Sequence, residues 1–195
     1  MRDERGFTLV EFMIAAAIMT AVLGGTVMLA SQMQQAYSTQ LDDATVEEEV
    51  RFSLDWIAQA LRNAGSNPYT ISPFTPIDVS ADGESITLLA DINPPDGLTT
   101  GENENVTIAF DAGAMAITRD DNSAVGDPEV MTEPVISGLL FTLFDSAGNA
   151  LVDGQEGLAT FVHVRVTGQS QAFNTFLGEG RTMTLETEVR VRTRP

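Results

Sequence analysis

The sequence predicts an α+β protein in which one long N-terminal α-helix packs on a C-terminal head of antiparallel β-sheet. Two patterns favour this fold class. Residues 7–67 contain no proline and repeat apolar side chains at helical spacing. From Pro73 onward, apolar and polar residues alternate with period two, as in strands that bury one face. A chain of 195 residues has room for one such domain and an appendage.

Residues 1–6 form a short polar leader in front of an apolar segment. The segment 7–30 has one charged residue, Glu11, near its start. As a helix it would extend about 36 Å at ~1.5 Å per residue, and the hydrocarbon core of a bilayer is about 30 Å thick. We therefore expect residues 7–30 to span a membrane.

A cleaved secretory signal and a plain membrane anchor are both open readings of this segment. The signal reading is weakened by Met28-Leu29-Ala30, a poor small-x-small cleavage site. The anchor reading must account for Glu11, because a carboxylate inside a bilayer costs roughly 2.5–3.5 kcal/mol or more. The positive end of the helix dipole would favour that carboxylate, which could also lie at the level of the lipid headgroups.

Residues 31–64 predict the amphipathic half of the same helix. Apolar side chains recur here at threes and fours: Met33, Tyr37 and Leu41, then Val46, Val50, Leu54, Ile57 and Leu61. Gly65 followed by Pro68 marks the stop. We expect one helix over residues 7–64, about 87 Å long, with its second half packed on the head. The alternative is two helices that break at Gly24-Gly25 or near Thr39.

Residues 65–195 are predicted to form the β-rich head. The segments 106–110 and 115–118 flank Asp111-Ala112-Gly113 and predict a hairpin. Clusters of Pro and Gly at 93–101 and 126–134 predict surface loops. Further strands are expected at 85–89, 139–144, 161–167 and 183–191, and a turn at 145–149 closes the strand 139–144. We expect these strands to make one antiparallel sheet with one face on the helix.

The composition excludes several kinds of chemistry. The chain has no cysteine, and its 28 acidic and 10 basic residues give a net charge of −18. Every basic residue is Arg. Such a charge repels phosphate backbones, so no nucleic-acid binding is expected through the head. The acidic surface keeps the head soluble or attracts Ca²⁺; residues 120–129 are the calcium candidate because hard oxygen ligands cluster there.

No catalytic constellation is found, so we expect no enzyme, no cofactor and no catalytic residue. His163 is the single histidine and is expected on the outer face of a strand, paired with a carboxylate. Neither a Gly-x-Ser-x-Gly elbow nor a phosphate loop or dinucleotide fingerprint occurs. Phe52 and Trp56 lie four residues apart on the helix and are expected to contact the core.

The residues Gly6-Phe7-Thr8-Leu9-Val10-Glu11 resemble the processing site of type IV prepilins and type II secretion pseudopilins. The resemblance implies a type IV pilin-like fold and cleavage by prepilin peptidase between Gly6 and Phe7. It also implies N-methylation of Phe7 and pairing of Glu11 with the terminal amine of a neighbouring subunit. Such a pair is tolerable in low dielectric, whereas either charge alone is costly.

The segment 51–65 is similar to a stretch of PilW-type minor pilins, and J-type pseudopilins carry a related one. Together with the proline-free apolar helix, this favours a minor pilin that helps initiate a type IV pilus. The implied partners are prepilin peptidase, other minor pilins and the major pilin. The implied location is the inner membrane, with the head in the periplasm, and then the pilus. A type II secretion pseudopilin and a membrane-anchored adhesin remain alternatives.

Overall fold

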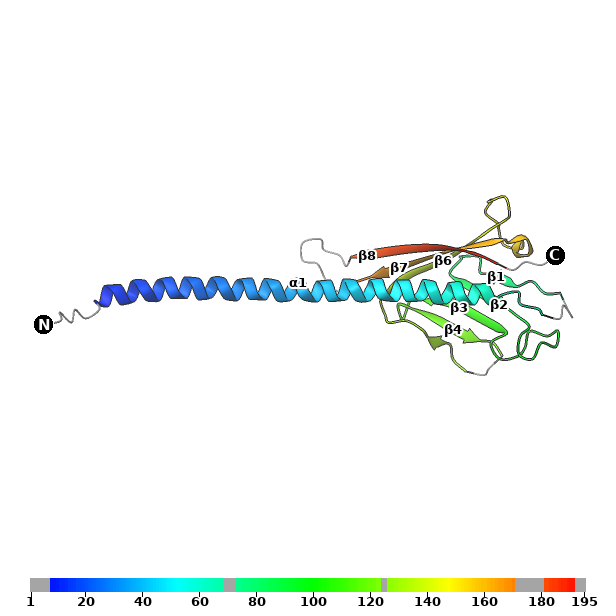
Figure 1. The fold of residues 1–195 in the computed structure, drawn as a ribbon, viewed down its shortest axis with the longest axis horizontal. Coiled ribbons are helices and arrows are strands. Elements are labelled where there is room, and N and C mark those ends of the chain that lie inside the picture. The colour runs from blue at the N-terminus through cyan, green and yellow to red at the C-terminus, as the bar shows by residue number, and fades with distance from the viewer. Residues whose placement is uncertain (1–7, 69–72, 124–125, 171–180, 192–195) are drawn as a thin grey trace. The chain divides into compact units, whose positions relative to one another are not determined.

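A computed structural model describes residues 8–68, 73–123, 126–170 and 181–191 (Figure 1). One helix, α1, runs over Leu9–Asn63. The prediction of a single long helix is therefore confirmed, without a break at Gly24-Gly25 or near Thr39. The helix begins two residues after Phe7, which lies outside the described residues, and it ends one residue before Ala64.

The chain divides into two compact units, Met1–Leu41 and Asp42–Pro195. In the first unit, the large apolar side chains of α1 from Leu9 to Leu29 are each at least 55% exposed. Among the described residues, α1 is the one helix that is long and apolar enough to cross a membrane. The apolar residues predicted to form one stripe are found in both units. Met33, Tyr37 and Leu41 belong to the first unit and are exposed.

The second unit contains the last turns of α1 and every described strand. The strands are β1 (Ile77–Val79), β2 (Ser85–Leu89), β3 (Asn105–Asp111), β4 (Ala116–Asp121), β5 (Glu129–Val130), β6 (Ile136–Phe144), β7 (Phe161–Gln169) and β8 (Thr182–Arg190), with a 3₁₀ turn at Glu156–Leu158. All pairings are antiparallel. The predicted hairpin is confirmed as β3 and β4. The predicted loop 126–134 is interrupted by β5.

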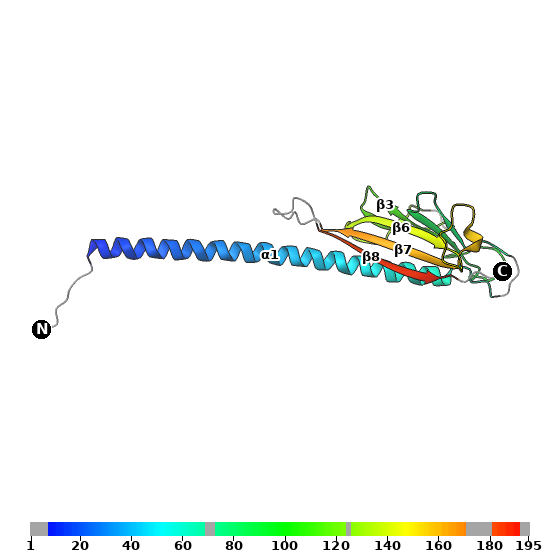
Figure 2. The same cartoon turned by 90° about the horizontal axis from the view of Figure 1, so that it is seen from above.

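The strands form two sheets, which corrects the prediction of one. A five-stranded sheet has the order β1-β2-β3-β4-β5, and a three-stranded sheet has the order β6-β7-β8 (Figures 1 and 2). Two backbone hydrogen bonds link β6 to turns of the first sheet: Ile136 N–H donates to the carbonyl of Met115, and Phe141 N–H donates to that of Gly83. Alternation with period two shows which face of a strand is buried, but it does not show which strands pair.

The core of the second unit lies where the last turns of α1 meet both sheets. The stripe Val46, Val50, Leu54, Ile57 and Leu61 is buried, as predicted, and forms one cluster with Ile77, Ile86, Ile108, Ile117, Val162, Val164 and Val166. The helix and β7 lie in close contact at Gly168. A Cβ atom added there would lie 2.6 Å from Val46 Cγ1 and 2.7 Å from Val50 Cγ2.

The end of α1 follows the predicted stop. Gly65 has φ = 73°, a value that favours glycine. Its N–H donates to the carbonyl of Leu89 at 2.8 Å, which ties the helix end to β2. The prediction for the aromatic pair is correct for Trp56, which packs partly buried against the core. It is wrong for Phe52, which is 50% exposed because it lies on another side of the helix from the buried stripe.

Candidate assembly site

The first turn of α1 is closed by a reciprocal pair of side chains, Thr8 and Glu11. Thr8 N–H and Thr8 Oγ1 both donate to Glu11 Oε2, at 2.9 and 2.8 Å. In return, Glu11 N–H donates to Thr8 Oγ1 at 3.3 Å. This is a capping box, in which an N-cap residue and the third helical residue satisfy each other's backbone donors. It explains why the helix begins at Leu9, directly after its cap.

The sequence interpretation assigned no role to Thr8. The signal was present, since Thr8-Leu9-Val10-Glu11 is the Thr-x-x-Glu pattern of a capping box in front of an apolar run. Gly6 and Phe7, the predicted processing residues, lie outside the described residues. Of the predicted site, the structure therefore places Glu11 alone.

The capping box holds the Glu11 carboxylate in a defined position at the start of the apolar helix. Both contacts with Thr8 fall on Oε2, so Oε1 takes no part in them. The side chain is exposed, and the helix dipole favours a negative charge at this end. A carboxylate arranged in this way can accept a hydrogen bond from a cation of another molecule without giving up its contacts with Thr8.

The apolar part of α1 satisfies its hydroxyl groups internally. Thr20 Oγ1 donates to the carbonyl of Ala16, Thr26 Oγ1 to that of Leu23, and Ser31 Oγ to that of Met28, each at 2.8 Å. In a bilayer or a filament core, a polar group without a partner would cost several kcal/mol, of order 2–7. These contacts remove that cost and suit the helix to an apolar environment.

Small residues interrupt the apolar surface of the same segment. A Cβ atom built on Gly24 or Gly25 would meet no atom within 4 Å. Ala15, Ala16 and Ala17 add a further small stretch about two to three turns earlier. Small side chains let the backbones of neighbouring apolar helices approach each other closely.

The calcium candidate gains no support from the described residues. Asp121 Oδ1 accepts from Ser123 Oγ at 2.7 Å, and its Oδ2 accepts from Asn103 N–H at 2.8 Å. Burial raises the pKa of Asp121, but these bonds and the nearby Arg119 outweigh it and lower that pKa. Within the described ranges, no group of three or more His, Cys, Asp or Glu side chains could hold a metal ion. Residues 124–125 of the candidate lie outside those ranges.

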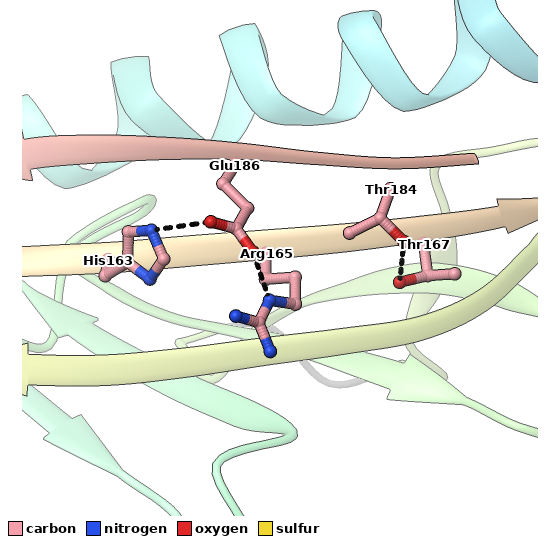
Figure 3. Close-up of polar contacts among 5 residues, drawn as sticks. All are labelled: His163, Arg165, Thr167, Thr184 and Glu186. Carbon is pink, nitrogen blue, oxygen red and sulfur yellow. Dashed lines mark hydrogen bonds and ion pairs between the residues drawn. The ribbon is translucent and has the colours of Figure 1, made fainter.

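His163 lies on the outer face of β7 and pairs with a carboxylate, as predicted (Figure 3). Its Nε2 lies 3.3 Å from Glu186 Oε2 on β8, and Arg165 bonds the other oxygen of Glu186. Two residues further along each strand, the Oγ1 atoms of Thr167 and Thr184 lie 3.1 Å apart. These cross-strand contacts hold β8 to β7.

Comparison with known families gives one match, at the N-terminal end of the chain. Residues 1–27 match the family described as "Prokaryotic N-terminal methylation motif". A comparison with curated proteins and a comparison with solved structures each give no match. The matched region contains the leader, the predicted processing residues, the capping box and most of the apolar segment.

The motif at residues 1–27 is typical of type IV pilins and pseudopilins, and the α+β architecture is consistent with a pilin-like fold. Proteins with this motif are structural rather than enzymatic, and the motif implies processing by prepilin peptidase and assembly with other pilins. An apolar N-terminal helix behind such a leader is consistent with anchoring in a membrane before assembly.

Proposed function

We propose that this chain is a minor pilin that is cleaved after Gly6 and joins a type IV pilus through α1, where it helps to initiate the filament. The observation that carries the proposal is the charged capping box at the start of an exposed apolar helix. The head, from about residue 65 to the C-terminus, would face the periplasm in the precursor and the surface in the pilus.

The proposed role of Glu11 follows from its cost in an apolar environment. Cleavage between Gly6 and Phe7 creates a new terminal ammonium on Phe7, one residue in front of the capping box. If that ammonium enters the filament core, it needs an anion, and Glu11 of a neighbouring subunit supplies one through Oε1. Because the capping box fixes the carboxylate, the ion pair would also fix the axial register between subunits.

The choice of a minor pilin over the major pilin rests on the segment 51–65, and J-type pseudopilins carry a related segment. In the structure its apolar members Leu54, Ile57, Ala58, Leu61 and Ala64 are buried. Part of its resemblance to PilW-type subunits therefore lies in residues that join α1 to the head. A minor role also fits a helix without the proline that major pilins often have within the apolar segment. Deletion of the gene, with pilus recovery and type II secretion measured in parallel, distinguishes a minor pilin from a pseudopilin.

Processing is tested on protein extracted from membranes. N-terminal sequencing should give Phe7 as the first residue, and the intact mass should include one N-methyl group. A mature N-terminus near Ser31 would instead identify an ordinary signal peptide and refute the proposal.

Assembly is tested with Glu11→Val as the only copy of the gene. The variant should insert into the membrane at least as well as the wild type, because an intramembrane charge is removed. It should be cleaved, yet fail to support pili recovered by shearing, because the neighbouring ammonium loses its partner. Glu11→Asp keeps the charge with a shorter reach and should be intermediate. Glu84→Val, which removes an exposed carboxylate of the head, is the matched control. Normal piliation with Glu11→Val would contradict the ion-pair mechanism.

A further inference from the structure

The last turns of α1 present a second face beside the buried stripe. Phe52, Trp56, Gln59 and Asn63 follow one another at intervals of three and four residues, so they share one side of the helix. Phe52 is 50% exposed, although it lies on a helix packed against the head.

A cavity of about 220 Å³ opens along this face, within the second unit. Trp56 and Ala60 of α1 line it together with Leu88 of β2 and Val106 of β3. Its polar lining comes from Gln59, Asn63, Asn103 and Arg119. Sites for drug-sized ligands have volumes of roughly 300–1,000 Å³. The cavity is smaller than that, and its size suits one inserted side chain.

The wall of the cavity formed by Ile92 is held in place by a buried carboxylate. Glu104 is 1% exposed. Its Oε1 accepts from the N–H groups of Ile92 and Asn93, and its Oε2 accepts from Gly101 N–H at 2.7 Å. Burial raises the pKa of Glu104, but the three bonds together lower it below its usual value. The carboxylate therefore stays charged at neutral pH, and the wall is in place before anything binds.

The charge at the cavity differs from that of the chain as a whole. The net charge is −18, yet the ionisable side chain that lines the cavity is the cation Arg119. Its Nη2 bonds Asn103 Oδ1, which holds the guanidinium at the lining. Asp121 also interacts with Arg119, and Asp127 and Glu129 line a neighbouring hollow with it, so these carboxylates offset part of its charge. The cavity thus combines an apolar floor with a cation on a protein that otherwise repels anions.

We propose that this cavity receives one aliphatic or aromatic side chain, next to a carboxylate, from an acidic neighbouring subunit. The size and the apolar floor select a single apolar side chain, and Arg119 selects the neighbouring carboxylate. The proposal goes beyond membrane insertion, processing and the role of Glu11, because it assigns a subunit contact to the head.

Trp56 is the single tryptophan of the chain and lines the cavity, so its fluorescence reports on occupancy directly. The probes are N-acetyl-L-leucine, which is an anion, and its neutral amide, N-acetyl-L-leucinamide. Added to the full-length protein in lipid nanodiscs, the anion should give a saturable change. Its affinity should exceed that of the amide by about two- to fivefold, the value of a partly exposed ion pair. A linear response, or equal affinity for both probes, would overturn the proposal.

Two variants locate the response in the cavity. Ala60→Phe fills the cavity and should abolish the saturable change, whereas Ala60→Ser should keep it. Arg119→Gln should keep binding but remove the preference for the anion, and Arg165→Gln on the outer face of β7 should have no effect. If Ala60→Phe proves unstable in a thermal melt, Arg119→Gln still decides the matter. A preference for the anion that survives Arg119→Gln would refute the assignment.

A second readout separates this proposal from that of the assembly helix. Ala60→Phe should be cleaved after Gly6 like the wild type, and yet yield fewer pili on shearing, because the contact of the head is blocked. Normal piliation with Ala60→Phe would overturn the docking role and leave the function of Glu11 untouched. Loss of piliation with Glu11→Val but not with Ala60→Phe would likewise overturn the docking role of the cavity and support the role of Glu11.

Discussion

At the first turn of α1, Glu11 serves its own helix and remains available to another molecule. Its Oε2 closes the capping box with Thr8, whereas its Oε1 lies outside that arrangement. A side chain that already has a structural role loses little further freedom when it meets a cation. Glu11 is thus pre-organised for the ion pair that we propose, and Thr8 is the residue that positions it.

Replacement of Thr8 tests this positioning. Thr8→Ala removes the side-chain cap, which is worth about 1 kcal/mol and therefore about fivefold in local opening. Hydrogen exchange of the Glu11 amide, which donates to Thr8 Oγ1, should accelerate by about that factor when measured by NMR in micelles. Thr8→Ser keeps the hydroxyl and should exchange like the wild type. The control is Thr20→Ala, since Thr20 bonds only the carbonyl of Ala16 on the same helix. Equal exchange in Thr8→Ala and Thr8→Ser would show that the capping box does not form.

At the scale of elements, the contact between α1 and β7 depends on the absence of a side chain at Gly168. The γ-methyl groups of Val46 and Val50 occupy the space where a Cβ atom would lie. Both valines are at most 3% exposed and belong to the core. Neither can move away easily, because buried branched side chains have few alternative rotamers.

Substitution of Gly168 should therefore weaken the packing of α1 on the three-stranded sheet. Gly168→Ala should lower the free energy of unfolding by about 1–3 kcal/mol, the usual cost of overpacking a core. Gly138→Ala is the matched control in β6, because its Cβ would make an ordinary contact of 3.8 Å with Thr167. Urea denaturation followed by circular dichroism measures both. If the two variants were equally stable, the close approach of α1 and β7 would be refuted.

The accuracy of the sequence-based predictions differs from element to element for physical reasons. The bounds of α1 were predicted within two residues, because the absence of proline and the Gly65 stop are local signals. The division into two sheets was missed, because pairing depends on partners far apart in the chain. The strands β1 and β5, of three and two residues, are too short to show a period.

Phe52 was expected in the core because it shares a side of the helix with Trp56. The spacing does not show whether that side is buried, and Phe52 lies outside the buried stripe. The role of Thr8 was readable from the Thr-x-x-Glu pattern and was missed.

At the scale of the whole molecule, α1 contributes to both units of the chain. Its apolar residues before Leu41 are exposed, whereas the stripe from Val46 to Leu61 is buried in the second unit. Each fully buried aliphatic side chain contributes about 1.5–3 kcal/mol. The stripe as a whole is therefore comparable with the net stability of a typical domain, about 5–15 kcal/mol. The head should not fold without this part of the helix.

Two truncations test this dependence. A chain of residues 42–195 retains the stripe and should be soluble, rich in β-structure and cooperative in thermal unfolding. A chain of residues 66–195 lacks it, exposes Val162, Val164 and Val166, and should aggregate. Size-exclusion chromatography and circular dichroism distinguish these outcomes.

Point substitutions within residues 42–195 separate the packing of the stripe from a general requirement for more chain. Ile57→Ser replaces a side chain with 0% exposure and should unfold the head. Ile→Ala in a core costs roughly 2–5 kcal/mol in transfer and cavity terms, and Ile→Ser should cost no less. Phe52→Ser, at a position that is 50% exposed on the same helix, should cost much less. If residues 66–195 formed a stable monomer, or if Ile57→Ser were as stable as Phe52→Ser, the stripe would not be needed for the fold of the head.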